Sequence, residues 1–244
     1  MSTDVFFTKA NLDRCLMALA KEFRKRNGTA VPAEIILIGG AAILENYGFR
    51  ESTYDVDAVI HASSAMKEAI NLVGDKMGLP NGWLNTDFTK TCSYTPKLTE
   101  YSIYYKTFSN VLSVRTVSAE YLIAMKLMAG RRYKHDLSDV AGILMEHERA
   151  GKPINREQID IAMQNLYSGW DNVPEDSKTF IMDVMQSQNY VALYQKYREE
   201  EQAGRTTLLE FEKGYPGVTN ESNVNAILKA AKERKDRQKQ EHNE

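Results

Sequence analysis

The sequence is poor in the features that mark several common classes of protein. It has two cysteines, Cys15 and Cys92, which lie far apart and argue against a disulfide scaffold or a cysteine-rich zinc site. Its four histidines form no pair with metal-ligand spacing. The formal net charge is only -2 over 244 residues, so a generally basic surface for nucleic acid is not expected, although a local basic patch remains open.

Long apolar runs are also missing. No stretch approaches the ~18 uninterrupted apolar residues that a membrane-spanning helix needs. The first residues do not show a basic segment followed by an apolar one, so a secretory signal is not indicated. We therefore expect a soluble, cytoplasmic protein with no membrane partner, long enough to bury its own core.

The first 150 residues mix helical and strand patterns. Apolar residues at three-and-four spacing predict a helix over residues 11–26, and an apolar run next to glycines predicts a buried strand at 34–38. By the same criteria, further helices are expected at residues 41–47, 63–77 and 118–128, with strands at 54–60, 101–108 and 111–117. Residues 80–96 are rich in turn formers and receive no firm element.

Strand patterns disappear after about residue 150. Helices are expected at residues 156–167, 175–187, 191–203 and 224–240. The sequence thus predicts an α/β (α+β) fold, in which a small mixed sheet with flanking helices spans residues 1–150. A helical C-terminal region is expected to follow over residues 151–244.

The most informative stretch is residues 35–60, where a glycine pair precedes a pair of acids. The predicted strand ends in Gly39 and Gly40, where the absence of Cβ lets a phosphate approach the backbone and the N-terminus of the next helix. Asp55 and Asp57 lie on one face of the following strand, opposite an apolar face. Two carboxylates so placed can bind Mg²⁺ (or Mn²⁺) together with triphosphate oxygens. The pattern therefore predicts phosphoryl or nucleotidyl transfer from a nucleoside triphosphate (NTP).

Each part of this pattern also has a purely structural explanation. A glycine pair after a strand is most often a tight turn, and two aspartates on one strand face are most often solvated. Aspartate is nevertheless depleted in strands, so two in one strand with an apolar opposite face require a reason. The combination is rarer than either part, and we favour the functional interpretation.

Gly39-Gly40, followed by Asp55 and Asp57 on either side of a hydrophobic residue, resembles the signature of the DNA polymerase β-type nucleotidyltransferase superfamily. Thr53 resembles the Ser or Thr often found before the acids of that signature. The resemblance implies a nucleotidyltransferase-like fold and an enzyme that moves a nucleoside monophosphate (NMP) to an acceptor. It implies Asp55 and Asp57 as catalytic metal ligands, and the glycines and Thr53 as nucleotide-binding residues.

The second half of the expected site departs from that superfamily. Its third acid commonly comes from a later strand, whereas residues 102–117 contain no Asp or Glu. Residues 121–144 instead resemble the bacterial AbiE-type toxin branch of minimal nucleotidyltransferases, including the related mycobacterial toxins. In that branch a helix bearing Lys, then Ala and Arg, precedes an Asp-x-x-Asp helix start. The matching residues are Lys126, Ala129, Arg131 or Arg132, Asp136 and Asp139.

The chemistry of these residues agrees with such a site. Lys126 can hold the triphosphate and neutralise the leaving pyrophosphate, and Arg131 adds positive charge for nucleotide binding. Asp136 is a candidate metal ligand, whereas Asp139 could complete the metal shell or accept a proton. Structural alternatives are an N-cap at Asp136, a dipole contact at Asp139 and a solvated Lys126. Which of the two acids completes the site is left open by the sequence.

The AbiE-type resemblance further implies the toxin of a toxin–antitoxin pair. A tRNA or a protein hydroxyl would then be the acceptor, and an antitoxin protein would be a partner. Three alternatives remain: a small-molecule, antibiotic-type nucleotidyltransferase, a catalytically silent nucleotide-binding module, and an interaction protein that acts through its helical tail.

Overall fold

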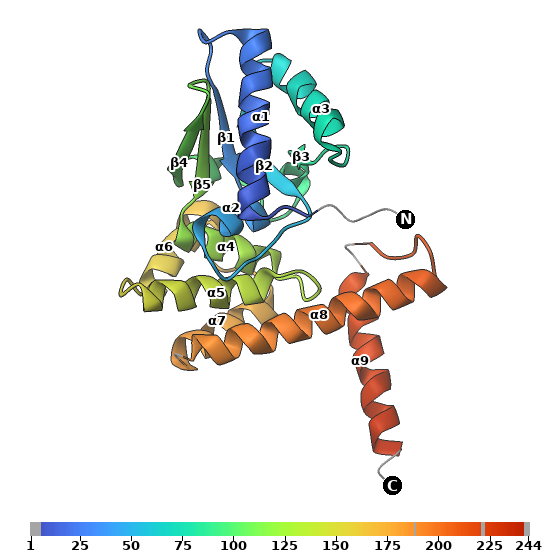
Figure 1. Ribbon diagram of the computed structural model, residues 1–244. Coiled ribbons are helices and arrows are strands. Elements are labelled where there is room, and N and C mark those ends of the chain that lie inside the picture. Colours follow the sequence, from blue (N-terminus) through green and yellow to red (C-terminus); the bar gives the residue numbers. More distant parts are fainter. Residues whose placement is uncertain (1–5, 188, 221–222, 242–244) are drawn as a thin grey trace.

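A mixed sheet and a layer of helices form the two parts of the molecule (Figure 1). The structure is a computed structural model that describes residues 6–187, 189–220 and 223–241. Within these ranges the sheet has five strands in the order β3-β2-β1-β5-β4. The strands are β1 (Ala33–Leu37), β2 (Val56–His61), β3 (Leu84–Asn85), β4 (Ser102–Phe108) and β5 (Leu112–Val117). The fold class predicted from the sequence is confirmed.

The helices alternate with the strands and then continue alone. They are α1 (Lys9–Asn27), α2 (Gly39–Asn46), α3 (Ala65–Met77), α4 (Ala119–Ala129), α5 (Asp136–Arg149), α6 (Arg156–Tyr167), α7 (Glu175–Ser187), α8 (Tyr190–Gly214) and α9 (Val224–Glu241). None of the described helices has both the length and the apolar character that crossing a bilayer would require.

The sheet is mixed because its central strand has one parallel and one antiparallel neighbour. β1 pairs with β2 in antiparallel and with β5 in parallel orientation. β4 and β5 form the expected hairpin, with Ser109 and Asn110 at φ values of 50° and 56° in its turn. Two successive left-handed residues match the right-handed twist of a hairpin, and Asn tolerates that conformation well.

One face of the sheet is covered and the other leads to the candidate site. The apolar residues of α1 at three-and-four spacing are buried, and α1 packs beside α3 over the sheet (Figure 1). Along β2, Val56 and Ala58 are fully buried, whereas Asp57 and Val59 on the opposite face are only half-buried. The predicted alternation of this strand is therefore confirmed, except that β2 begins at Val56 and leaves Asp55 immediately before it.

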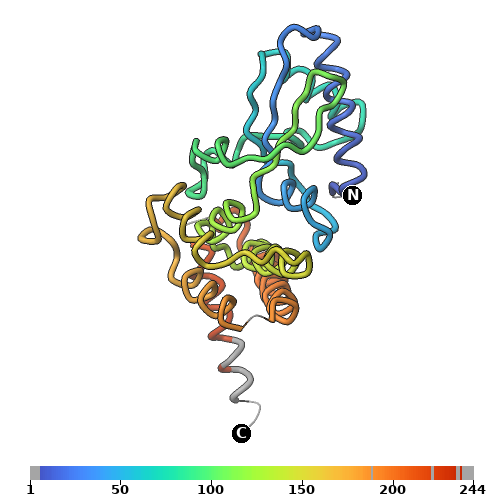
Figure 2. The backbone as a smooth tube through the Cα atoms, turned by 90° about the vertical axis from the view of Figure 1, so that its left-hand side faces the viewer, coloured from blue at the N-terminus to red at the C-terminus, as the bar shows by residue number. Residues whose placement is uncertain are grey.

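The C-terminal helices form a second layer below the sheet. α4 packs against α5 and α6, and α8 crosses the layer against α5 (Figure 1). α9 leaves this layer and points away from the sheet, as both views show (Figure 2). The predicted division of the chain near residue 150 stays a prediction.

Some details of the predicted helices differ in the structure. Ser64 occupies the N-cap position of α3, one of the two positions expected, but its side chain makes no capping hydrogen bond, and the hydroxyl of Ser63 donates to Asn27 Oδ1 at 2.8 Å instead. α8 does not end at residue 203 but runs on to Gly214. Gly204 therefore lies inside the helix, at a place where a neighbouring segment passes too close for any side chain, as described below.

Candidate active site

The glycine pair begins α2 and lies against two side chains from the connection between α2 and β2. Gly39 has a φ of 53°, a left-handed conformation that favours glycine. A Cβ on Gly40 would lie 2.6 Å from Thr53 Oγ1 and 2.9 Å from Arg50 Nη2. Both glycines are therefore required by the local geometry. They leave the N-terminal N–H groups of α2 accessible to an anion beside Thr53 and Arg50.

Gly40→Ala is expected to lower the free energy of unfolding by about 1–3 kcal/mol, because the added methyl group overpacks the space between Thr53 and Arg50. Gly48→Ala is the matched control, since no atom lies within 4 Å of a Cβ at that position. This control should change stability by no more than about 0.5 kcal/mol. Urea unfolding of both variants measures the difference. Equal stability of the two would mean that the packing around Gly40 is loose.

The two acids stand at the beginning of β2, and a buried threonine fixes the first of them. The hydroxyl of Thr53 donates to the carbonyl of Asp55 at 3.2 Å and approaches Asp55 Oδ1 at 3.4 Å. Thr53 is held in turn by two backbone hydrogen bonds to Phe7, of 2.6 and 2.9 Å. Asp55 is exposed and Asp57 is half-buried, so both carboxylates are accessible from the same side of the chain.

Asp57 is electrostatically coupled to its neighbour and to cations from a later segment. Burial and the charge of Asp55 raise the pKa of Asp57 to about 6. Lys134, Arg131 and Lys126 act in the opposite direction. The segment from α4 to the start of α5 therefore faces the acid pair, and two parts of the site that are distant in sequence meet at this carboxylate.

Lys126 lies in the interior of this segment and bridges two carboxylates. Its side chain is 8% exposed, and Nζ lies 3.0 Å from Asp136 Oδ1 and 2.8 Å from Asp139 Oδ2. Burial lowers the pKa of Lys126, but the charges of Asp139 and Asp136 outweigh it, so that the pKa is raised overall. The interpretation of Lys126 as a solvated lysine is wrong.

Asp136 is completely buried and bonded to cations through both of its oxygens. Besides Lys126, the Nε of Arg131 lies 2.8 Å from Oδ2, and the backbone N–H of Arg131 donates to the same atom at 3.1 Å. Burial alone would raise the pKa of Asp136, but these cations hold it well below its usual range. Asp136 is not the N-cap of α5, because His135 occupies that position. A metal ion at Asp136 would have to displace Lys126 or Arg131.

Arg50 is a member of the site to which the sequence assigned no role. Its Nη1 donates to Asp139 Oδ1 and Oδ2 at 2.9 and 2.7 Å, and its Nε donates to the carbonyl of Ser52 at 3.1 Å. Asp139 thus joins Arg50, which lies against Gly40, to Lys126. The only signal in the sequence was an arginine between the glycine pair and the acid pair.

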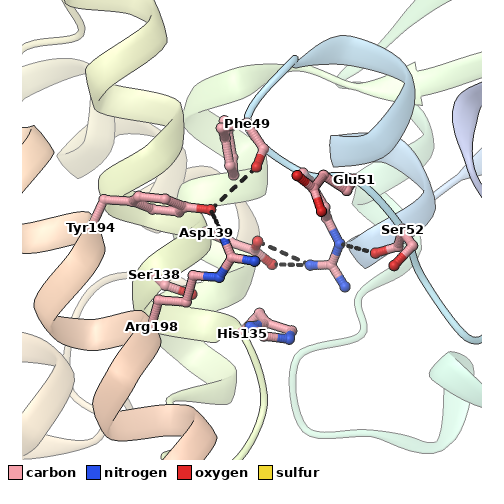
Figure 3. Close-up of a pocket in the computed structure, with 9 residues that line it drawn as sticks. Phe49, Glu51, Ser52, His135, Ser138, Asp139, Tyr194 and Arg198 are labelled. Carbon is pink, nitrogen blue, oxygen red and sulfur yellow. Dashed lines mark hydrogen bonds and ion pairs between the residues drawn. The ribbon is translucent and has the colours of Figure 1, made fainter.

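A small cavity adjoins this ion pair, between the α2–β2 connection, α5 and α8 (Figure 3). Arg50, His135, Asp139, Tyr194 and Arg198 are among its walls, and its volume is about 90 Å³. That volume holds a few water molecules, each of which takes about 30 Å³ in the liquid, but not a nucleotide.

The structure brings the predicted site residues into two groups. Gly40, Thr53 and Asp55 form one group, and the partners of Lys126 form the other; Arg50 joins them through Asp139. Of the two arginines that the sequence left open, Arg131 belongs to the second group, whereas Arg132 pairs with Asp176 on the surface. In the part of the chain that the structure describes, no three His, Cys, Asp or Glu side chains are grouped to hold a metal ion by themselves.

This arrangement defines a nucleotidyltransferase class of site, with a glycine pair, an acid pair and facing cations. The chain matches the family described as "Nucleotidyltransferase of unknown function (DUF6036)" over residues 14–148, which is more than half of its length. The protein belongs to this family, and the resemblance at superfamily level is confirmed. No curated protein and no solved structure matches the chain.

Proposed function

We propose that the protein transfers an NMP from an NTP to an acceptor hydroxyl with release of pyrophosphate. The observation that carries this proposal is that the glycine pair, the acid pair and the buried cations come together. Gly40 lies against Thr53, whose hydroxyl bonds to Asp55, and against Arg50, which Asp139 joins to Lys126. The N–H groups at the start of α2, which can bind an anion, and the cations of the α4–α5 connection thus flank one pair of acids. Transfer of a nucleotidyl group requires such an arrangement.

The acid pair fits a divalent cation such as Mg²⁺ or Mn²⁺. The donors are carboxylate oxygens, which these ions prefer, and burial together with the charge of Asp55 raises the pKa of Asp57, so a cation bound there would favour the ionised carboxylate. Asp55 and Asp57 would hold the ion together with oxygens of the nucleotide. When bound, such an ion neutralises the charge that develops on the phosphates during transfer.

The other residues of the site act by binding and positioning. The N–H groups at Gly39 and Gly40 receive a phosphate, and Arg131 contributes positive charge for the triphosphate. Lys126 supports this charge from the interior. Asp139 has both oxygens bonded to Arg50 and Lys126, so it is better suited to hold these cations than to accept a proton.

For the acceptor we propose tRNA or a protein hydroxyl, and for the biological role the toxin of a toxin–antitoxin pair with an antitoxin as partner. This part rests on the resemblance of residues 121–144 to the AbiE-type branch. It is an inference by analogy from Lys126, Arg131, Asp136 and Asp139, and the acceptor must be established by experiment.

The decisive test incubates the purified protein with Mg²⁺ and each α-³²P-labelled NTP, against bulk tRNA and against the protein itself. Label should pass to one acceptor and be lost in Asp55→Ala, because that variant removes an acid that the reaction requires. Asp75→Asn, at an exposed acid of α3, is the control and should keep wild-type activity. Transfer by Asp55→Ala at the wild-type rate would contradict the assigned site. The absence of transfer to either acceptor would contradict the proposed tRNA or protein acceptor.

A further inference from the structure

The long helix α8 lies far from the acid pair in sequence but contacts its surroundings at several points. The hydroxyl of Tyr194 donates to the carbonyl of Phe49 at 3.2 Å, beside the cavity shown in Figure 3. About three turns further along the helix, the guanidinium of Arg205 lies 4.9 Å from the ring centroid of Tyr54, the residue before Asp55. One face of α8 is therefore directed toward the site.

Glu201 lies between these contacts and caps another helix. Its side chain is 3% exposed, and Oε1 accepts hydrogen bonds from the backbone N–H groups of Leu137 and Ser138 at 2.8 and 3.2 Å. Oε2 accepts from the hydroxyl of Ser138. The N-cap residue of α5 itself, His135, makes no side-chain capping bond. The first turn of α5 is thus capped by a carboxyl group from α8, which provides partners for N–H groups that have none within the helix.

Burying this carboxylate carries a cost. Burial raises the pKa of Glu201 to about 8, although the hydrogen bonds from Ser138 and Leu137 oppose the shift. The ring of His135 lies beside it, with Nδ1 3.8 Å from Oε2, but burial lowers the pKa of His135, so this ring does not supply a permanent positive charge. An apolar residue could pack at this position without the penalty of burying a carboxyl group. The stability of the fold alone therefore does not explain why a glutamate stands here.

A second contact fixes the same segment independently. A Cβ on Gly204 would lie 2.7 Å from the backbone oxygen of Arg132, so only glycine allows α8 to approach the connection between α4 and α5 so closely. This connection carries Arg131 and Lys134, two of the cations that act on Asp57. One turn of α8, which carries Glu201 and Gly204, therefore contacts the segment that faces the acid pair.

We propose that Glu201 is a positioning residue, which fixes the α4–α5 connection and the start of α5 so that Arg131 faces Asp57 and the bound nucleotide. The inference rests on the proposed function, because it assigns the nucleotide phosphates to that segment. It makes the helical C-terminal region a part of the nucleotide site. A merely structural Glu201 would contribute to overall stability without a selective effect on the connection or on nucleotide binding.

The test compares Glu201→Ala with Glu201→Gln and with the control Glu200→Ala, an exposed acid one position earlier in the same helix. Hydrogen exchange measured by mass spectrometry reports on the amides of residues 130–139. Isothermal titration with each NTP and Mg²⁺ reports on nucleotide affinity. In Glu201→Ala, the amides of residues 137–139 should exchange at least about ten-fold faster. Its nucleotide affinity should fall about ten-fold. Glu201→Gln should remain within about three-fold of wild type, because its amide can replace both kinds of hydrogen bond.

Unchanged exchange at residues 130–139 in a folded Glu201→Ala variant would overturn the proposal. So would faster exchange without weaker nucleotide binding. If Glu201→Ala does not fold, Gly204→Ala carries the same two measurements, because its methyl group displaces Arg132 from the other side. If the wild-type protein binds no NTP, the proposed function fails, and the nucleotide part of this inference fails with it. The exchange measurement still decides whether Glu201 fixes the connection.

Discussion

Asp57→Asn is expected to abolish nucleotidyl transfer and, at the same time, to make the folded protein more stable at pH 7.5. Burial and the charge of Asp55 raise the pKa of Asp57 to about 6, so the ionised carboxylate destabilises the folded state. An amide of nearly the same shape removes this charge, and the free energy of unfolding should rise by about 1–2 kcal/mol. Transfer should fall by about 1,000-fold or more, since the variant loses the carboxylate that would help to hold a divalent cation at the reacting phosphates. Urea unfolding and the labelling assay measure the two effects.

The stability gain should depend on pH in one direction. Asp57 titrates near the model-peptide value of 3.8 in the unfolded chain and near 6 in the folded protein. The folded state therefore holds the proton more tightly, and wild-type protein regains stability as the pH falls from 6 toward 4. The advantage of Asp57→Asn should be largest above pH 6 and absent below about pH 4. A difference that stays constant over this range would mean that Asp57 is not perturbed.

Mg²⁺ provides a check that does not depend on the acceptor. An ion held between Asp55 and Asp57 binds the folded state only, so it should raise the melting temperature of the wild-type protein. The same addition should have little effect on Asp57→Asn. Equal responses of the two proteins would contradict a cation site at the acid pair.

The expected loss of activity and gain of stability rest on the same property that made the acid pair a candidate in the sequence. Two aspartates in a strand are unfavourable for the fold, and residues kept against the needs of the fold indicate a function. The glycine pair was recognisable for a related reason, because Gly39 requires a left-handed φ and Gly40 a close approach. Both signals are local, and local patterns also predicted most of the helices and strands.

The contacts that complete the site could not be predicted because they join distant residues. Arg50 meets Asp139 where the neighbouring Phe49 packs against Gly142, at which a Cβ would lie 2.5 Å from the phenyl ring. The cap of α5 by Glu201 similarly depends on how α8 packs on α5. Periodicity identifies which side of a helix is apolar, but not which helix packs against it. The α8 contacts at the site therefore appear only in the structure.

Lys126→Met is expected to have the largest effect on stability of any single change at the site. Methionine fills a similar volume but leaves the fully buried Asp136 and the nearly buried Asp139 without their shared cation. Removing one partner of a buried ion pair typically costs about 3–5 kcal/mol, and we expect the lower end of this range because Arg131 still pairs with Asp136 and Arg50 with Asp139. Lys152→Met, at an exposed lysine near the end of α5, is the control and should change stability by no more than about 0.5 kcal/mol. Urea unfolding at neutral pH measures both.

The loss should shrink on acidification. In the wild-type protein Lys126 and Arg131 hold the pKa of Asp136 below its usual range, so their contribution to stability is present above the unfolded pKa and is lost as the pH falls. In Lys126→Met the pKa of Asp136 should rise, because only Arg131 remains beside it. Protonation of the Asp136 carboxylate at low pH then removes the negative charge that Lys126 no longer compensates. Lys126→Met should also lose transfer under conditions in which it remains folded, since the positive charge behind the nucleotide is gone. A folded and fully active variant of reduced stability would mean that Lys126 serves the fold alone, and that Arg131 and Lys134 provide the charge that acts on the nucleotide.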